Sequence, residues 1–218
     1  MNDEDKDYYP DPEDFNIEPR RPPGPLAHFP SLRHSMPALL CFFICYMATV
    51  AYYRYPAGEY LWVSGSSIYL NHEYWRLLTA IFTHADLSHL LANALILLVF
   101  GWMLKAYFGW IVFPLFTILI GLITNLIVIT VYDPGTKLLG ASGMAYAMVA
   151  LWLVFYLRHD VDHRVPVRML RAVGFSLVMM FPSTFDPRVS YLAHAVGFGA
   201  GLVAGLMVLP FISVREPV

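Results

Sequence analysis

Six long apolar runs set the strongest limit on what this chain can fold into. A helix needs about 20 mostly apolar residues to cross the hydrocarbon layer of a bilayer. The chain is 58% hydrophobic and 14% charged, whereas a soluble domain carries about 25% charged residues. We therefore predict an all-α polytopic membrane protein with six transmembrane helices, at roughly residues 37–53, 89–107, 110–132, 142–157, 168–182 and 191–212. The fourth and fifth runs are short, as expected for helices that begin inside protein rather than against lipid.

Both ends of the chain lie outside these runs. Half of the 16 acidic residues fall in the first 18 positions, and prolines cluster between residues 19 and 30. Such a segment buries too little apolar surface to offset the entropy lost on ordering. We expect residues 1–35 to form a disordered acidic and proline-rich tail, residues 36–212 a six-helix domain, and residues 213–218 a short C-terminal tail. The acidic start also argues against a signal peptide.

The basic residues orient the six helices, because cytoplasmic segments carry an excess of Lys and Arg. The tails and the second-to-third and fourth-to-fifth connections together hold ten basic residues. The remaining connections hold four, namely Arg54, Arg76, Lys137 and Arg188. We therefore expect both termini to face the cytoplasm, so that the second, fourth and sixth helices begin at the outer side.

Several classes of function receive no support from the sequence. The net charge is -2 and no basic patch is present, so no nucleic-acid partner is expected. Cys41 and Cys45 suggest packing rather than a disulfide framework or a metal site. His84 and His89 are five residues apart, which is a poor spacing for two metal ligands on one helix. The charged segment 158–164 mixes both signs and indicates a solvated loop. No metal and no cofactor are predicted.

Polar residues at the outer ends of two helices point to nucleophilic catalysis. Ser142, in the sequence Gly140-Ala141-Ser142-Gly143, begins the fourth run, and Tyr146 follows one helical turn later. His194 occupies the corresponding place in the sixth run. A neutral imidazole can take the proton of a serine hydroxyl, and polar groups at membrane depth are costly enough to suggest function. We interpret Ser142 and His194 as a catalytic dyad, with no third member assigned to Asp133 or Asp186.

Two further patterns support this site. Gly197 and Gly201 form a small-residue stripe on the face of the sixth helix that carries His194, where another backbone can approach closely. Taken alone, that stripe is an ordinary packing seam. His89 and Asn93 lie one turn apart on the second helix, and both can donate hydrogen bonds to a developing oxyanion.

In this order and topology, the motifs resemble those of the rhomboid family of intramembrane serine proteases. The resemblance covers about residues 37–212 and rests on the Gly140–Gly143 tetrapeptide, on Ala193-His194 followed by Gly197 and Gly201, on His84, His89 and Asn93 in the order H-x4-H-x3-N, and on Tyr74-Trp75-Arg76. One departure is Lys105, where many bacterial members carry a glutamate, which puts a stabilising interhelical contact in doubt.

The resemblance implies a role for each matching residue. Ser142 is the nucleophile and His194 the base, and His89 and Asn93 assist the oxyanion. Tyr146 packs on the catalytic histidine, and Gly143 supports the site. Structural roles are expected for His84, Trp75, Arg76, Gly140, Gly197 and Gly201.

The function implied is an intramembrane serine endopeptidase that cuts transmembrane protein substrates near the outer face of the bilayer. The expected location is a bacterial inner (cell) membrane, and no oligomeric state is specified. The alternative is an inactive rhomboid-like protein that binds membrane clients without cutting them. Such proteins typically lack the serine or the histidine, and this chain has both. A transporter or channel would need a polar midplane site or repeated halves, which the sequence lacks.

Overall fold

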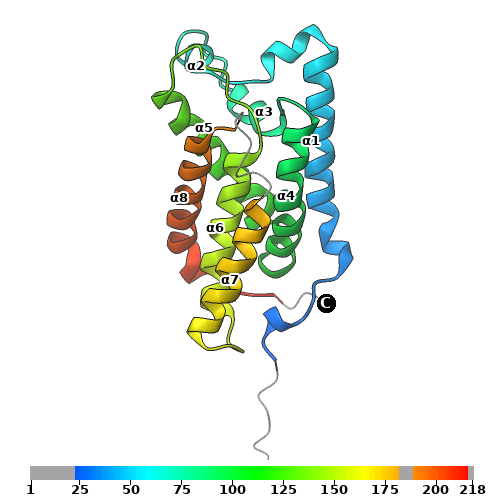
Figure 1. Cartoon of the computed structure of the whole chain (residues 1–218), viewed down its shortest axis with the longest axis vertical. Coiled ribbons are helices and arrows are strands. Elements are labelled where there is room, and N and C mark those ends of the chain that lie inside the picture. Colours follow the sequence, from blue (N-terminus) through cyan, green and yellow to red (C-terminus); the bar gives the residue numbers. More distant parts are fainter. Residues whose placement is uncertain (1–22, 182–188, 216–218) are drawn as a thin grey trace, which may run out of the picture.

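The computed structural model describes residues 23–181 and 189–215, shown in Figure 1. In this part of the chain the regular structure is helical, and the one strand-like contact is an isolated bridge between Val63 and Leu138. The helices are α1 (Met36–Arg54), α2 (Gly65–Tyr69), α3 (Arg76–Phe82), α4 (Leu87–Phe108), α5 (Thr117–Val131), α6 (Ser142–His159), α7 (Val165–Met180) and α8 (Tyr191–Val208). The all-α prediction is therefore confirmed.

The six predicted runs correspond to α1, α4, α5 with the turn before it, α6, α7 and α8. Four stretches of the described chain are long and apolar enough to cross a membrane, namely Leu32–Arg54, Leu87–Phe108, Ile111–Val131 and Tyr191–Phe211. Helix α7 has only 16 residues and is too short. Helix α6 is also not among the stretches that are long and apolar enough. The four stretches are sufficient to make this an integral, multi-pass membrane protein.

Helix α6 is the core of the bundle. It packs against α4, α5, α7 and α8, and every residue from 142 to 152 is buried. Small side chains allow α8 to lie close to it. A Cβ added at Gly201 of α8 would lie 2.6 Å from the carbonyl oxygen of Ala147, which is closer than carbon and oxygen normally approach. The glycine stripe therefore packs against α6.

The connection between α1 and α4 is folded around Arg76. This buried side chain forms an ion pair with Glu73, with 2.7 Å between Nε and the carboxylate. It also donates hydrogen bonds to the carbonyl oxygens of Glu59 and Trp62, and its guanidinium lies over the Trp62 ring. Trp75, the preceding residue, is exposed. Arg76 thus joins the start of α3 to the chain that follows α1.

Residues 23–35, which we call the N-terminal strap, correct one prediction. Disorder was expected through residue 35, but the strap contains two 3-10 turns, Pro25–Ala27 and Leu32–Ser35. Polar groups of the bundle hold it in place. The Asp162 carboxylate accepts from the Gly24 N–H, the Tyr107 hydroxyl donates to the His28 carbonyl, and the Trp102 indole donates to the Ser31 carbonyl. Composition alone does not show such a docking surface. Residues 1–22 of the expected tail lie outside the described residues.

The last described residues, up to Arg215, lie at the same end of the bundle as the strap (Figure 1). The N–H of Arg215 donates to the carbonyl oxygen of Tyr107 at 2.8 Å. Lys105, one turn from the end of α4, is buried and holds its ammonium 5.1 Å from the centre of the Trp110 ring. A cation near a helix C-terminus is favoured by the helix dipole. The aromatic ring and the helix end thus stabilise Lys105, which stands where many bacterial rhomboid proteins carry a glutamate.

Candidate active site

Helices α4, α6 and α8 begin at the end of the bundle opposite the strap. Two of the three helices start with a side-chain cap. The Asp86 carboxylate accepts from the N–H of His89, and the Ser190 hydroxyl accepts from the N–H of Ala193. Helix α6 has no side-chain cap, and Ser142 is its first residue. Because the first N–H groups of a helix have no partner within the helix, donors near Ser142 are available to an external acceptor.

The turn before Ser142 depends on Gly140 and His84. Gly140 has a φ of 125°, which favours glycine. A Cβ there would also lie 2.8 Å from the His89 ring. The next residue, Ala141, donates its N–H to Nε2 of His84 at 3.2 Å. Burial, aided by the nearby His89, lowers the pKa of His84 to about 3. His84 is therefore neutral and able to accept this bond.

Helices α6 and α8 touch directly beside the two predicted catalytic residues. A Cβ at Gly197 would collide with the carbonyl oxygen of Gly143 and lie 2.9 Å from its carbon. One turn from each of these glycines, the rings of Tyr146 and His194 stack with their centres 4.0 Å apart and their planes 15° from parallel. The structure thus brings Ser142 and His194 to neighbouring places on two helices in contact.

The His194 side chain is buried, and its Nε2 atom has no hydrogen-bond partner among the described residues. The Ser142 hydroxyl is thus not bonded to Nε2 in this conformation. Catalytic hydrogen bonds are often long in a ligand-free enzyme and tighten when substrate binds.

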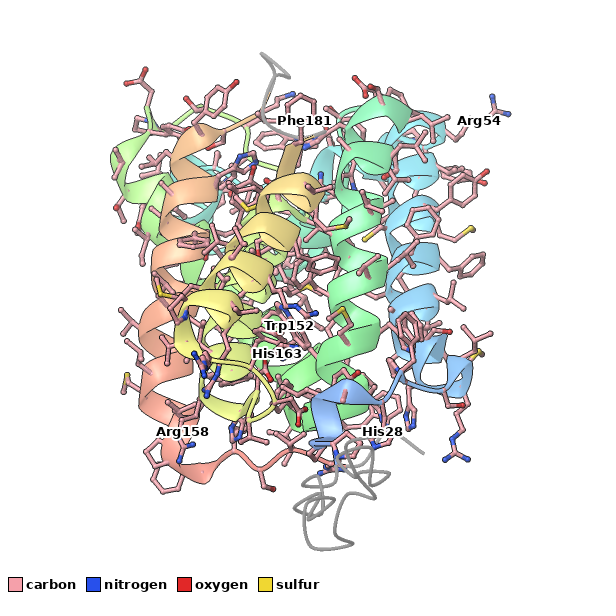
Figure 2. All side chains as sticks on the ribbon, turned by 60° about the horizontal axis from the view of Figure 1, so that its bottom comes forward. His28, Arg54, Trp152, Arg158, His163 and Phe181 are labelled. Carbon is pink, nitrogen blue, oxygen red and sulfur yellow. The ribbon has the colours of Figure 1, made fainter. Side chains whose placement is uncertain are left out.

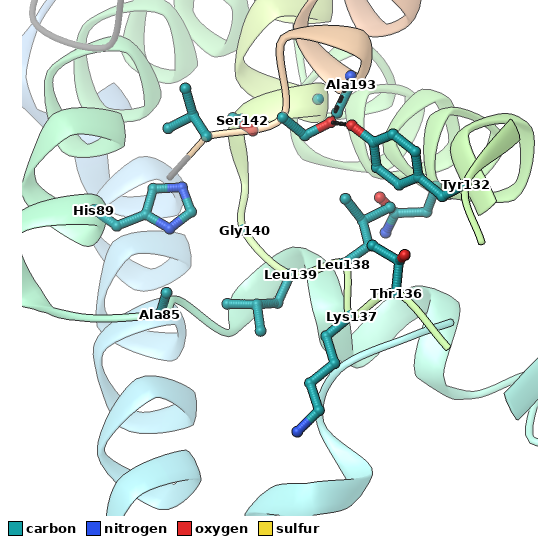
Figure 3. A pocket seen from close by; sticks show the side chains of 14 residues that line it. Ala85, His89, Tyr132, Thr136, Lys137, Leu138, Leu139, Gly140, Ser142 and Ala193 are labelled. Carbon is teal, nitrogen blue, oxygen red and sulfur yellow. Dashed lines mark hydrogen bonds between the residues drawn. The ribbon is translucent and has the colours of Figure 1, made fainter. Parts of the chain in front are cut away.

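A cavity of about 280 Å³ opens beside Ser142 (Figure 3). His89 and Ser142 line it, as does the segment from Thr136 to Gly140. Its wall also includes three polar residues that the sequence reasoning missed, Asn125, Tyr132 and Ser190. The Tyr132 and Ser190 hydroxyls are 2.6 Å apart and hydrogen-bonded, joining the end of α5 to the start of α8. Asn125, a lone amide inside an apolar run, was the one detectable signal, because such groups are costly in a membrane.

Other predicted residues lie around this cavity or away from it. Asn93 is buried one turn below His89, and its amide donates to the His89 carbonyl at 2.9 Å. Asn93 does not line the cavity. Trp75 and Arg76 belong to the α3 region and lie outside it. No hydrogen bond or ion pair joins Asp133 to His194 in the described chain. The alternative third member, Asp186, lies outside the described residues.

The two histidines weighed as metal ligands pack edge to face, with ring centres 5.1 Å apart. Within residues 23–181 and 189–215, no group of three or more His, Cys, Asp or Glu side chains is placed to hold a metal ion. The His163 ring, in the loop weighed as a ligand cluster, instead contacts the Asp160 carboxylate at 3.0 Å.

Several known proteins have sequences similar to this chain. The chain is 26% identical over 185 residues to Rhomboid-related protein 1 of Caenorhabditis elegans, a match that covers 72% of this chain and 51% of that protein. RHOMBOID-like protein 1 of Arabidopsis thaliana is 28% identical over 144 residues, covering 66% and 37%. Rhomboid-like protease 2 of Toxoplasma gondii is 26% identical over 136 residues, covering 62% and 47%. The chain therefore spans about half or less of the length of these relatives.

A family model for the rhomboid domain matches residues 71–211. That match covers well over half of the chain, runs from before α3 to the end of α8, and includes both Ser142 and His194. The chain belongs to the rhomboid family.

Proposed function

We propose that the protein is an intramembrane serine endopeptidase that cleaves transmembrane protein substrates with a dyad of Ser142 and His194. The observation that carries this proposal is the contact between α6 and α8. The backbones meet at Gly143 and Gly197, and the Tyr146 ring stacks on the His194 ring one turn away. This arrangement holds a buried imidazole beside a serine that faces a cavity.

In the proposed mechanism the serine hydroxyl turns to donate its hydrogen bond to Nε2 of His194. As the oxygen attacks the scissile carbonyl, His194 takes the proton and then gives it to the leaving amine when the C–N bond breaks. Water next attacks the acyl ester, and His194 takes the proton of that water and returns it to Ser142. The Tyr146 ring keeps the imidazole in one orientation through both steps.

The negative charge that develops on the substrate carbonyl needs hydrogen-bond donors. The uncapped N–H groups at the start of α6 and the His89 side chain border the same cavity as Ser142. Such donors act when they are already aimed at the position where charge appears. Because its amide donates to the backbone of its own helix, Asn93 contributes by positioning the His89 turn.

The experiment that tests this function compares variants on a model single-span substrate in liposomes. Ser142→Ala and His194→Ala should each abolish cleavage, because the pair acts as one unit. Thr136→Ala is the matched control, since it removes another hydroxyl from the same cavity, at an exposed position, and should keep the activity. Labelling by a fluorophosphonate probe reports the serine directly. A wild type that neither cuts nor reacts with the probe would instead favour the inactive, client-binding alternative.

We also propose that all six long helices cross the bilayer, with both termini cytoplasmic and the cavity near the outer face. The excess of basic residues in the cytoplasmic segments supports this orientation. The strap and Arg215 lie at the end opposite the cavity, as the orientation requires. A single cysteine at Gly135, introduced into a chain lacking Cys41 and Cys45, should react with an impermeant thiol reagent from outside. Labelling of a cysteine at His159 from outside would invert the topology.

A further inference from the structure

A second cavity lies at the end of the bundle opposite the candidate active site. Its volume is about 370 Å³, and it is enclosed by the strap together with α4, α6 and α7. Figure 2 shows His28, Arg158 and His163 toward this end, while Arg54 and Phe181 are at the other. The proposed proteolytic mechanism uses no residue of this second cavity.

The cavity combines aromatic walls with one cation. Trp152 and Phe175 are among its apolar lining residues, and Arg171 lines it from α7. Arg171 is exposed at this cavity, and both its guanidinium and the Asp160 carboxylate lie near the Tyr156 hydroxyl. No ion pair involving Arg171 occurs in the described part of the chain. The guanidinium is therefore not paired directly with a carboxylate.

The nearby acidic groups are already engaged. The Asp160 carboxylate accepts from the Asp162 N–H and contacts the His163 ring. Both oxygens of Asp162 accept from the N–H of Gly24 in the strap, at 2.9 and 3.0 Å. The same end of the bundle also carries Arg158, Arg164 and Arg168. An anion approaching this cavity thus meets an excess of positive charge.

The surface next to the cavity is apolar. On α7, the helix that carries Arg171, the side chains of Leu170, Val173, Leu177 and Val178 are exposed. In a multi-pass membrane protein, an exposed apolar helix face of this kind lies against lipid. Arg171 therefore lies where a charged pocket borders the hydrocarbon, and a ligand that fits both surroundings needs an anionic head and an apolar tail.

We propose that this cavity binds the phosphate headgroup of an anionic phospholipid, with Arg171 holding the phosphate and the acyl chains lying along the exposed face of α7. Basic pockets between helices on the cytoplasmic side are suited to such headgroups. Ala27 and His28 of the strap line the pocket on the side away from the helices. The proposal does not depend on proteolytic activity.

The test measures lipid binding by native mass spectrometry of the full chain in detergent. The probes are phosphatidylglycerol, phosphatidylcholine and soluble glycerol phosphate, which separates a lipid from a free phosphate. Wild type should retain phosphatidylglycerol in preference to phosphatidylcholine. A basic residue near a charged lipid surface contributes about 1 kcal/mol, so Arg171→Gln should weaken phosphatidylglycerol binding about fivefold. Arg171→Lys should keep most of the preference.

Two more variants make the result specific to the cavity. Ala27→Trp should reduce phosphatidylglycerol binding by filling the pocket from the exposed strap without altering the core. Arg54→Gln removes an exposed cation at the other end and should change nothing. Equal binding of the two lipids overturns the proposal, as does unchanged binding in both Arg171→Gln and Ala27→Trp. Competition by glycerol phosphate at the same concentration would reduce the site to a general anion site and also overturn it.

Discussion

Adding a single methyl group at Gly197 tests whether the contact between α6 and α8 positions the dyad. In Gly197→Ala the new Cβ would lie 2.9 Å from the carbon and 3.0 Å from the Cα of Gly143, and closer still to its oxygen. Ordinary contacts begin at 3.4 Å, so the helices have to separate by at least about 0.5 Å. A misplacement of about 1 Å at an active site can cost about 100-fold in rate.

We therefore expect Gly197→Ala to lower turnover by about 10- to 100-fold. Overpacking of this kind also costs about 1–3 kcal/mol of stability, so the thermal melting temperature in detergent should fall. Cleavage and fluorophosphonate labelling are measured well below that temperature, so that unfolding does not imitate a misplaced dyad.

Two other glycines of α8 provide matched controls. Gly199 has no atom within 4 Å of an added Cβ, so Gly199→Ala should behave like wild type. Gly201→Ala creates a comparable collision with Ala147, one turn deeper, and should lower stability more than activity. The reasoning would be refuted by wild-type turnover in Gly197→Ala, or by a larger loss of turnover in Gly201→Ala.

The remaining predictions concern residues around the dyad. Tyr146→Ala should slow cleavage up to about tenfold, because a stacked aromatic pair contributes about 0.5–1.5 kcal/mol, whereas Tyr146→Phe keeps the ring and should retain most of the rate. His89→Ala should lower turnover about 10²–10³-fold, the usual cost of losing an oxyanion donor. Asn93→Ala should have a smaller effect in the same steady-state assay. Equal effects would contradict the different placement of the two residues. His84→Leu leaves the N–H it binds without an acceptor and should reduce stability by about 1–3 kcal/mol, so an unchanged melting temperature would show that this bond is dispensable.

The hydrophobic pattern located the long helices to within a few residues, because the bilayer demands a minimum apolar length. It did not show α3 or the order within the N-terminal strap. Short helices have no such length requirement, and both depend on specific contacts with other segments. Arg76 holds the α3 region through carbonyl groups that are remote in sequence. The Tyr107 and Trp102 side chains hold the strap in a similar way.

The residues of the candidate site were likewise only partly predictable from the sequence. Ser142 and His194 were detectable because each is a polar residue at the start of an apolar run, and because the glycine stripe indicates which helix faces meet. Tyr132 and Ser190 carry no such signal. Each is an ordinary end-of-helix residue until the fold brings their hydroxyls to 2.6 Å. Pairwise proximity of this kind depends on how α5 and α8 are arranged, which periodicity does not encode.

The burial of α6 has a consequence for how the protein is made. Helix α6 is not among the stretches of the described chain that are apolar and long enough to cross a membrane on their own, yet neighbouring helices surround it. The earlier helices α4 and α5 therefore supply part of the protein surroundings in which α6 is placed. Of the helices that pack against α6, α8 is the last in the sequence. Its His194 is synthesised 52 residues after Ser142. A nascent chain thus holds its serine without a base until α8 has been made, and the proposed hydrolytic activity arises only after that.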